Sequence, residues 1–188
     1  MPNSTDAVGS LRSMPELTFL PASQHPELLA VPVAAALPAG AAIEVAEVDP
    51  ALADTAAFCE AYDQPLDISA NCIVVEGIRG EVTTYAACVV LATTRADVNS
   101  TVRKLLDARK ARFAPMDAAV AMTGMEYGGI TPIGLPAEWR LLVDSRVAAL
   151  PRIVIGAGIR GAKLFLPGEV LAGLPNAEVI EGLASTST

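Results

Sequence analysis

The chain has 188 residues, which is enough for one domain of ordinary size with a short appendage and too few for two full domains. Hydrophobic residues make up 52% of the sequence and charged residues 18%, so the chain can bury a sizeable core and is not a disordered protein. The net charge of −8 argues against indiscriminate nucleic-acid binding, including DNA binding, because neutralising phosphates requires clustered Lys and Arg.

No targeting or membrane segment is expected from the sequence. The longest uncharged run, residues 28–43, is interrupted by Pro32 and Pro38 and is shorter than the roughly 18 to 20 apolar residues of a membrane helix. Residues 1–10 contain neither the basic nor the apolar part of a secretory signal. We therefore expect a cytoplasmic protein with no membrane partner.

The cysteines and the single histidine exclude several kinds of chemistry. Cys59, Cys72 and Cys88 lie far apart without a CxxC pair, so neither a disulfide framework nor a thiolate metal site is expected. His25 is the only histidine and lies outside the periodic body of the chain, which argues against zinc sites and against Ser-His or Cys-His catalysis. We predict neither a metal nor a cofactor.

The chain begins with an appendage, a strand and a helix. Residues 1–24 form a polar N-terminal segment, and the apolar residues 28–37 predict a short helix. The alternating pattern of residues 42–48 predicts a strand, and Asp49 can then cap a helix over residues 50–62. We expect an N-terminal extension at residues 1–40, the domain at 41–184 and a tail at 185–188.

A hairpin and a second helix follow. Two β-rich runs, residues 71–75 and 83–92, are joined by the glycine-containing residues 77–80, which predicts an antiparallel hairpin. Asp97 or Asn99 can cap the next helix, which has an apolar stripe on one side and basic residues on the other.

Charge is distributed unevenly along the chain. Residues 1–78 have one basic and eleven acidic side chains, a net charge of −10, whereas residues 79–188 have twelve basic and ten acidic ones, a net charge of +2. We expect a cluster of basic residues to be either a solvated helix face or a local patch that binds one end of a polyanion. This basic cluster consists of Arg103, Lys104, Arg109, Lys110 and Arg112.

The second half of the chain predicts short strands and helices around an unusual loop. Residues 126–136, EYGGITPIGLP, contain three glycines and two prolines and should form a tight loop. Strands are expected at residues 112–114, 140–143, 152–155, 163–166 and 177–180, with helices at 116–122, ended by Gly124, and at 167–174. Because strands occur both in hairpins and beside helices, we predict an α/β (α+β) fold with a mixed, mostly antiparallel sheet and helices packed around it.

Residues 156–161 match the G-x-G-x-x-G pattern of dinucleotide-binding proteins, and Glu178 follows at a suitable distance. That motif requires a helix starting within it, whose N-terminal amides hold the pyrophosphate. Here Pro167 would break such a helix after one to two turns. We therefore favour a hairpin at this position over a nucleotide site.

The loop over residues 126–136 has two interpretations. It is either a connector that crosses the edge of a sheet, or a site where the backbone N–H groups of Gly128 and Gly129 converge on an anionic centre. Asp144, at the end of an apolar strand, is either a helix cap or a carboxylate that faces a cleft.

At this loop the sequence resembles a known family. The segments TGMEYGGITPIGLP, LLVD and VIGAGIRGAKLFLPGEVLAGL follow the earlier segments VAEVDPALADTAAFCEAY, NCIVV and YAACVVLA. In this order they resemble the YbaK/ProX-type aminoacyl-tRNA deacylases, the free-standing relatives of the editing domain of bacterial prolyl-tRNA synthetases. The resemblance covers residues 42–183.

The resemblance implies an editing-domain fold and a hydrolase that cleaves the ester between a mischarged amino acid and the terminal ribose of tRNA. Binding to the tRNA acceptor end would be weak and transient. The sequence leaves open whether the protein forms a homo-oligomer. The family's catalytic positions fall on Asn71, Gly128, Gly129 and Asp144. Substrate binding is expected at Thr55, Tyr127, Ile130, Thr131 and Pro132, and at Arg103, Lys104, Arg109 and Lys110 of the basic cluster.

One position departs from the family pattern. The family has a lysine before an apolar strand, and the matching residue here is Asn71. A neutral amide with two donors replaces a full positive charge, which can reduce the rate about a hundredfold or more. The competing hypothesis is therefore a non-catalytic module that binds aminoacyl-tRNA or a nucleotide without hydrolysis.

Overall fold

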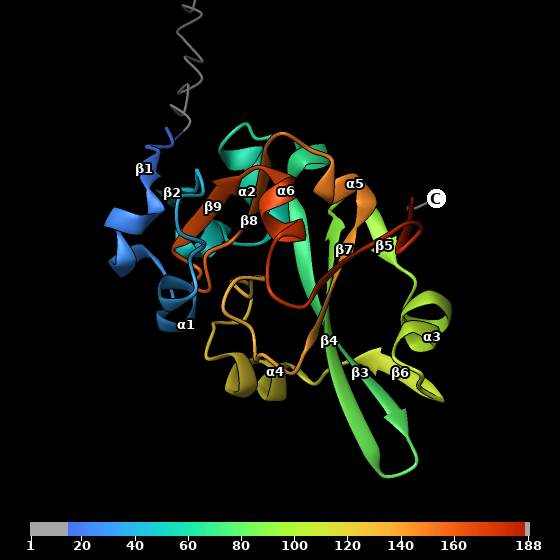
Figure 1. Cartoon of the computed structure of the whole chain (residues 1–188). Coiled ribbons are helices and arrows are strands. Elements are labelled where there is room, and N and C mark those ends of the chain that lie inside the picture. Colours follow the sequence, from blue (N-terminus) through green and yellow to red (C-terminus); the bar gives the residue numbers. More distant parts are fainter. Residues whose placement is uncertain (1–14, 187–188) are drawn as a thin grey trace, which may run out of the picture.

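The computed structural model describes residues 15–186 and folds them around two main sheets (Figure 1). One sheet has five strands in the order β10-β7-β4-β3-β6, and the other has four in the order β1-β2-β9-β8. The strands are β1 (Leu20–Pro21), β2 (Glu44–Glu47), β3 (Ala70–Arg79), β4 (Val82–Leu91), β5 (Thr94–Ala96), β6 (Lys110–Phe113), β7 (Arg140–Asp144), β8 (Ile153–Gly156), β9 (Ala162–Leu166), β10 (Ala177–Ile180) and β11 (Ala184–Thr186). The α-helices are α1 (Val31–Ala35), α2 (Thr55–Ala61), α3 (Arg103–Leu105), α4 (Met116–Thr123), α5 (Ser145–Ala148) and α6 (Gly168–Ala172).

Antiparallel pairing predominates in these sheets. In the five-stranded sheet, β3 pairs antiparallel with β4 and β6, while β7 pairs parallel with β4 and β10. All pairings of the four-stranded sheet are antiparallel, as is the pairing of β5 with β11. The structure confirms the predicted α/β fold with a mixed, mostly antiparallel sheet.

The central strand β4 is apolar throughout its second half because both of its faces are covered. Ala87 and Val89 pack into a core that they share with the four-stranded sheet and α1. Cys88 and Val90, on the other face, pack against β11 and the turn of π-helix at Val98–Val102 that precedes α3. A strand buried on both faces reads as a continuous apolar run, which is the pattern of residues 86–91.

The two main sheets meet at the start of β3. An isolated parallel bridge joins Ser69 to Val154 of β8, while β6 pairs with β3 only from Val75 to Ile78. Between these two contacts, one edge of β3 has no strand partner among residues 15–186. This open edge faces the cavity described below.

The N-terminal segment is part of the folded core from residue 20 onward. Leu20 of β1 pairs with Val45 of β2, and Val33 of α1 is fully buried in the largest core cluster. The backbone N–H of Ala30 also donates to the carbonyl of Ala157, at 3.0 Å. Residues 20–35 of the expected extension at 1–40 are therefore packed onto the domain, whereas residues 1–14 and 187–188 lie outside the described residues.

Three expected elements differ from the structure. The single helix predicted over residues 50–62 is divided into a 3-10 turn at Pro50–Leu52, capped by Asp49, and the separate helix α2. The predicted turn at 77–80 is too long, because β3 continues to Arg79 and only two residues separate it from β4. The expected tail contains β11, which pairs with β5 and was not foreseen because Ser and Thr residues there gave no strand signal.

Among residues 15–186, no helix is both long and apolar enough to cross a membrane.

Candidate active site

A cavity of about 490 Å³ lies where the two main sheets meet. Its walls come from the first half of β3, the start of α2, β8, residue 163 of β9, the loop at 127–130, and the segment from the end of β6 into α4. Most of the lining is apolar, with a few polar side chains on the wall formed by α2, β3 and β9. A largely apolar hollow with a few convergent polar groups is the usual form of a small-molecule site.

Thr55 and Asn71 meet on this polar wall. Thr55 is the first residue of α2, and Asn71 is the second residue of β3. The Thr55 hydroxyl donates to the Asn71 side-chain oxygen at 2.8 Å. This bond fixes the amide of Asn71, whose NH₂ group has no acceptor among residues 15–186. The structure thus brings together two of the residues singled out in the sequence.

The open edge of β3 adds backbone groups to the same wall. The carbonyl of Val74 accepts from Ala114, at 2.9 Å, on the side of β6. Backbone groups of alternate strand residues point to the same edge, so those of Cys72 face the cavity side. Cys72 itself lines the cavity.

Lys163 is the one cationic residue in the cavity lining. It lies in the middle of β9, between Ala46 of β2 and Gly156 of β8, and only 6% of it is exposed. Its Nζ donates to the carbonyl of Ala53 at 2.6 Å. Burial lowers the pKa of this ammonium from its ordinary value, and nearby Cys59 and Asp54 partly oppose that effect. Nothing in the sequence singles out Lys163, because it lies within an apolar strand pattern.

The glycine loop, defined as residues 126–131, forms another part of the cavity wall through residues 127, 128 and 130. Gly128 lines the cavity with φ +81°, a left-handed conformation that favours glycine. Within the described part of the chain, the N–H groups of Gly128 and Ile130 have no protein acceptor. The N–H of Gly129 instead donates to the carbonyl of Glu126, at 2.9 Å. We expected the free N–H groups at Gly128 and Gly129. They are instead at Gly128 and Ile130, because the N–H of Gly129 is bonded within the turn.

The glycine loop is fastened to the turn between β8 and β9. The N–H of Glu126 donates to the carbonyl of Gly158, and the N–H of Gly158 donates to the carbonyl of Gly129, both at 2.8 Å. A Cβ on Gly129 would lie 2.7 Å from backbone atoms of Ile159, so the contact is too close for any side chain there. Reciprocal backbone bonds of this kind give the loop a fixed shape.

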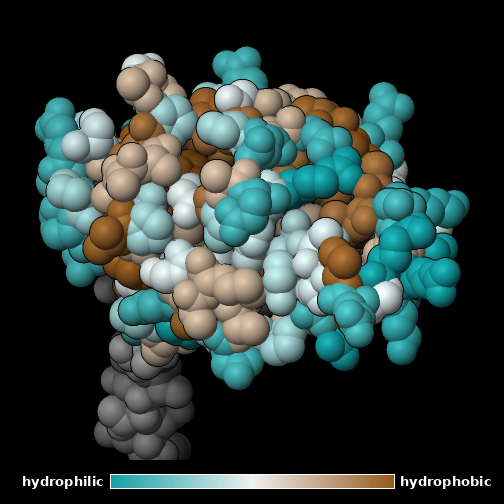
Figure 2. All heavy atoms as spheres, turned by 60° about the horizontal axis from the view of Figure 1, so that its bottom comes forward, coloured by the Kyte–Doolittle hydropathy of each residue, from teal (hydrophilic) through white to brown (hydrophobic). Residues whose placement is uncertain are grey.

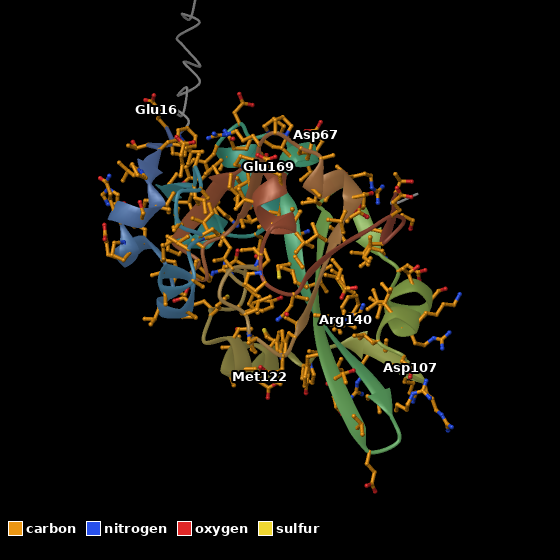
Figure 3. The ribbon with its side chains drawn as sticks, viewed as in Figure 1. Glu16, Asp67, Asp107, Met122, Arg140 and Glu169 are labelled. Atoms are coloured by element: carbon orange, nitrogen blue, oxygen red, sulfur yellow. The ribbon has the colours of Figure 1, made fainter. Side chains whose placement is uncertain are left out.

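The G-x-G-x-x-G pattern belongs to this turn. Residues 156–161 connect β8 and β9, which pair antiparallel from Ile153 to Gly156, and no helix begins there. Glu178 is occupied on β10, where it forms two hydrogen bonds of 2.6 and 2.7 Å with the Arg140 guanidinium (Figure 3). The expectation of a hairpin at residues 156–161 is confirmed, and a dinucleotide site of the Rossmann type is excluded there.

Thr131, the last residue of the glycine loop, and Pro132 after it lie outside the cavity. Both are buried, and neither belongs to the lining. The N–H of Thr131 points to the sulfur of Met125, at 3.4 Å. We expected both residues to contact substrate. They are instead buried outside the cavity, where they support the residues of the loop that line it.

Asp144 is also placed differently from the expectation that it shapes the cavity. It caps α5 by accepting from the N–H of Arg146, and its two oxygens accept from the Arg146 guanidinium at 2.8 and 2.9 Å. It also accepts from the N–H of Ala184, and it is fully buried. The helix-cap interpretation of Asp144 is the one that the structure bears out, and the residue does not line the cavity.

Three large, exposed side chains form the rim of the cavity. Phe113 is 59% exposed, Met116 54% and Tyr127 60%. Arg160 lies beside them, where its guanidinium donates to the carbonyls of Pro50 and Tyr127 at 3.1 and 3.3 Å. Exposed aromatic side chains next to a cavity offer stacking surfaces to a planar ligand. Tyr127 was expected here, whereas Phe113 and Met116 read as ordinary strand and helix residues.

The basic cluster lies on α3 and β6, and β6 leads directly to the rim at Phe113. Lys104, Arg109, Lys110 and Arg112 are exposed, and Arg103 is half-buried. Arg112 pairs with the buried Glu76. Asp107, which Figure 3 labels, pairs with Arg79 at the hairpin. Figure 2 shows hydrophilic side chains gathered on the right of the molecule, the side that carries α3 and β6 in Figure 1.

The cysteines do not provide a nucleophile. Burial, with a smaller contribution from Cys88, raises the pKa of Cys72 far above its ordinary value. Burial raises the pKa of Cys88 to about 12. Such thiols stay protonated at neutral pH and are poor nucleophiles. Residues 15–186 also contain no group of three His, Cys, Asp or Glu side chains placed to hold a metal ion.

Comparison with known proteins identifies a family. The family described as aminoacyl-tRNA editing domain matches residues 49–174, a range that contains every residue lining the cavity. The resemblance seen in the order of the sequence segments is thereby confirmed.

Solved structures share the fold. A candidate trans-editing enzyme for prolyl tRNA synthetase matches with a TM-score of 0.63 and 19% identity, over 74% of this chain and 85% of that one. The hypothetical protein APE2540 matches with a TM-score of 0.62 and 21% identity, over 71% and 85%. A scaffold protein used for computational epitope grafting gives 0.64 and 19%, over 74% and 85%. At these identities the similarity is one of fold.

Proposed function

Because this chain belongs to the aminoacyl-tRNA editing domain family, we propose that it is a trans-acting deacylase that hydrolyses the ester of a mischarged aminoacyl-tRNA. The observation that carries the proposal is the cavity itself. It combines an apolar lining, a fixed Thr55–Asn71 pair, and a glycine loop with free amide donors at Gly128 and Ile130.

The arrangement suits an ester that is already activated. Water adds to the ester carbonyl carbon, and the carbonyl oxygen becomes an oxyanion that the N–H groups of the glycine loop stabilise. Collapse of this intermediate breaks the bond to the ribose oxygen, which takes one proton of the water while the other passes to solvent. The neighbouring ribose hydroxyl assists the attack, so the reaction requires no protein nucleophile.

The cavity also has groups for the rest of the substrate. The Asn71 amide donors and the Cys72 backbone carbonyl face the space where the amino acid would lie, and the apolar lining receives its side chain. Tyr127 and Phe113 at the rim would stack on the terminal base, a contact worth about 1 to 3 kcal/mol per base. The basic cluster would contact phosphates of the acceptor stem, while the acidic remainder keeps binding weak.

The second candidate function is a binding module that retains the fold without turnover. The neutral side chain of Asn71 on the polar wall favours it, because a charged donor there would stabilise the transition state more strongly. Binding of a non-hydrolysable aminoacyl-adenosine together with zero turnover would identify this case.

The test is deacylation by the purified protein with a panel of mischarged tRNAs that starts with alanyl- and cysteinyl-tRNA-Pro. We expect metal-independent release of the amino acid above the buffer rate for at least one tRNA. Gly128→Val, which places a branched side chain at φ +81°, should abolish the release, whereas Glu81→Gln at the exposed hairpin tip serves as the matched control. Release at the buffer rate for the whole panel would overturn the proposal.

A further inference from the structure

Lys163 is a buried cation without an anionic partner. Among residues 15–186, no carboxylate lies within 4.0 Å of its Nζ, and the carbonyl of Ala53 is its one hydrogen-bond acceptor. An ammonium has three donors, so two remain unused on the cavity side. Burying a charge is costly unless an opposite charge or several hydrogen bonds compensate for it.

The surroundings of Lys163 do not supply an anionic partner within ion-pair distance. Its Nζ lies 5.4 Å from the centre of the Phe58 ring, a contact that attracts a cation without neutralising it. Asp54 is the one acidic residue in the lining, and its carboxylate is directed to Arg160 at 3.8 Å. A protonated Lys163 therefore has no carboxylate partner in the described lining, and an anionic group in the cavity would provide one.

The position of Lys163 indicates which anionic group this is. The side chain enters from β9 and lines the same cavity as Thr55, Asn71 and the glycine loop. Lys163 is almost completely buried, whereas Arg160 is a half-buried cation at the rim, where its guanidinium binds the carbonyl of Tyr127. A charge at this depth faces the group that enters the cavity, which for an aminoacyl ester is the acyl end.

We propose that Lys163 is a catalytic residue that stabilises the oxyanion formed on the ester carbonyl during deacylation. This inference rests on the proposed function. As water adds to the carbonyl carbon, the negative charge on the former carbonyl oxygen is held by Lys163 Nζ from one side and by the glycine-loop amides from the other. Lys163 keeps its proton throughout, and the leaving ribose oxygen takes its proton from the attacking water. The cation that Asn71 lacks is thus supplied from a different strand.

The first test compares deacylation by Lys163→Met with that of the wild type. We expect kcat to fall roughly 10²- to 10³-fold with a smaller change in KM, since the lost interaction forms in the transition state. Arg95→Met removes an exposed cation on β5 and is the matched control. Circular dichroism and thermal melting establish that both variants fold. A Lys163→Met variant that hydrolyses as fast as the wild type would overturn the inference and leave the proposed function intact.

The second test needs no turnover. Two analogues of an aminoacyl-adenosine are titrated into both proteins: a neutral amide, and a phosphonate whose tetrahedral P–O⁻ mimics the oxyanion. Lys163→Met should bind the phosphonate at least 10-fold more weakly than the wild type and the amide equally well. Equal loss for both analogues, or no loss, would mean that Lys163 only supports the carbonyl of Ala53. If the wild type hydrolyses no ester, the proposed function fails, and this titration still decides whether Lys163 faces the anionic centre.

Discussion

The Thr55 hydroxyl donates to the side-chain oxygen of Asn71 at 2.8 Å, and this bond orients both Asn71 donors on the wall of the cavity. We predict that Thr55→Val lowers kcat/KM for deacylation about fivefold to tenfold, the effect of a single neutral hydrogen bond. Thr55→Ser keeps the hydroxyl and should retain most of the activity. Equal rates for the valine variant and the wild type would show that this bond does not position Asn71.

A lysine at position 71 gives a second prediction. Asn71→Lys places two ammonium groups on one cavity wall, where like charges repel and lower each other's pKa. We therefore expect no large gain in rate from Asn71→Lys alone. In the Lys163→Met background the same change restores a single cation, and the double variant should recover at least tenfold over Lys163→Met. Steady-state kinetics of the four proteins measure this coupling as a double-mutant cycle.

The two neighbouring glycines of the loop should respond differently to alanine. Gly129→Ala forces the loop away from the backbone of Ile159, so we expect a loss of about 1 to 3 kcal/mol in unfolding free energy. At Gly128 the nearest atom to a new Cβ is the flexible end of Arg160, so the main cost is the left-handed conformation, about 1 to 2 kcal/mol. Thermal melting with deacylation assays should find Gly129→Ala less stable and Gly128→Ala more impaired in activity per folded molecule.

Asp144 should contribute to stability and not to catalysis. Burial opposes ionisation of Asp144, but the hydrogen bonds from Arg146 and Ala184 prevail and lower its pKa. A carboxylate with a lowered native pKa stabilises the fold above its unfolded pKa, and this contribution is lost as pH falls through the native value. We predict that Asp144→Asn lowers stability by about 2 kcal/mol at neutral pH and that the difference from the wild type shrinks below about pH 4. Denaturant titrations at several pH values measure it, and kcat of the folded variant should be unchanged.

The basic cluster gives a prediction that depends on substrate length. Arg109→Gln with Lys110→Gln removes two exposed cations, so KM for aminoacyl-tRNA should rise and the dependence of binding on log salt should become less steep by about two. Hydrolysis of a short aminoacyl-adenosine, which does not reach β6, should be unaffected. A change for both substrates would place the cluster in the chemistry of the cavity instead.

Much of the fold could be predicted from the sequence because its signals are local. The alternation in β2, the long apolar run of β4, and Gly124 at the end of α4 each specify one element. The split before α2 was missed because the pattern around Asp54 continues as a helix would. β11 exists because Asp144 and β5 hold it from distant parts of the chain.

The site was predicted less completely, for a physical reason. Thr55, Asn71 and Gly128, which belong to recognisable sequence segments, line the cavity. Lys163 was missed because its significance comes from burial beside a cavity, a property created by three-dimensional packing. Asp144 was misplaced for the converse reason: a carboxylate at a strand end looks the same in sequence whether it faces a cleft or caps a helix.

The bond from Ala30 to Ala157 has a practical consequence for anyone who trims this protein. A fragment restricted to the family match, residues 49–174, would lose β1, α1 and β2 at its beginning and β10 and β11 at its end. Removal of Val33 and Val45 would leave cavities in the core. The turn between β8 and β9, which anchors the glycine loop, would lose its hydrogen bond from Ala30. The unit that keeps this core intact is therefore longer than the stretch that identifies the family.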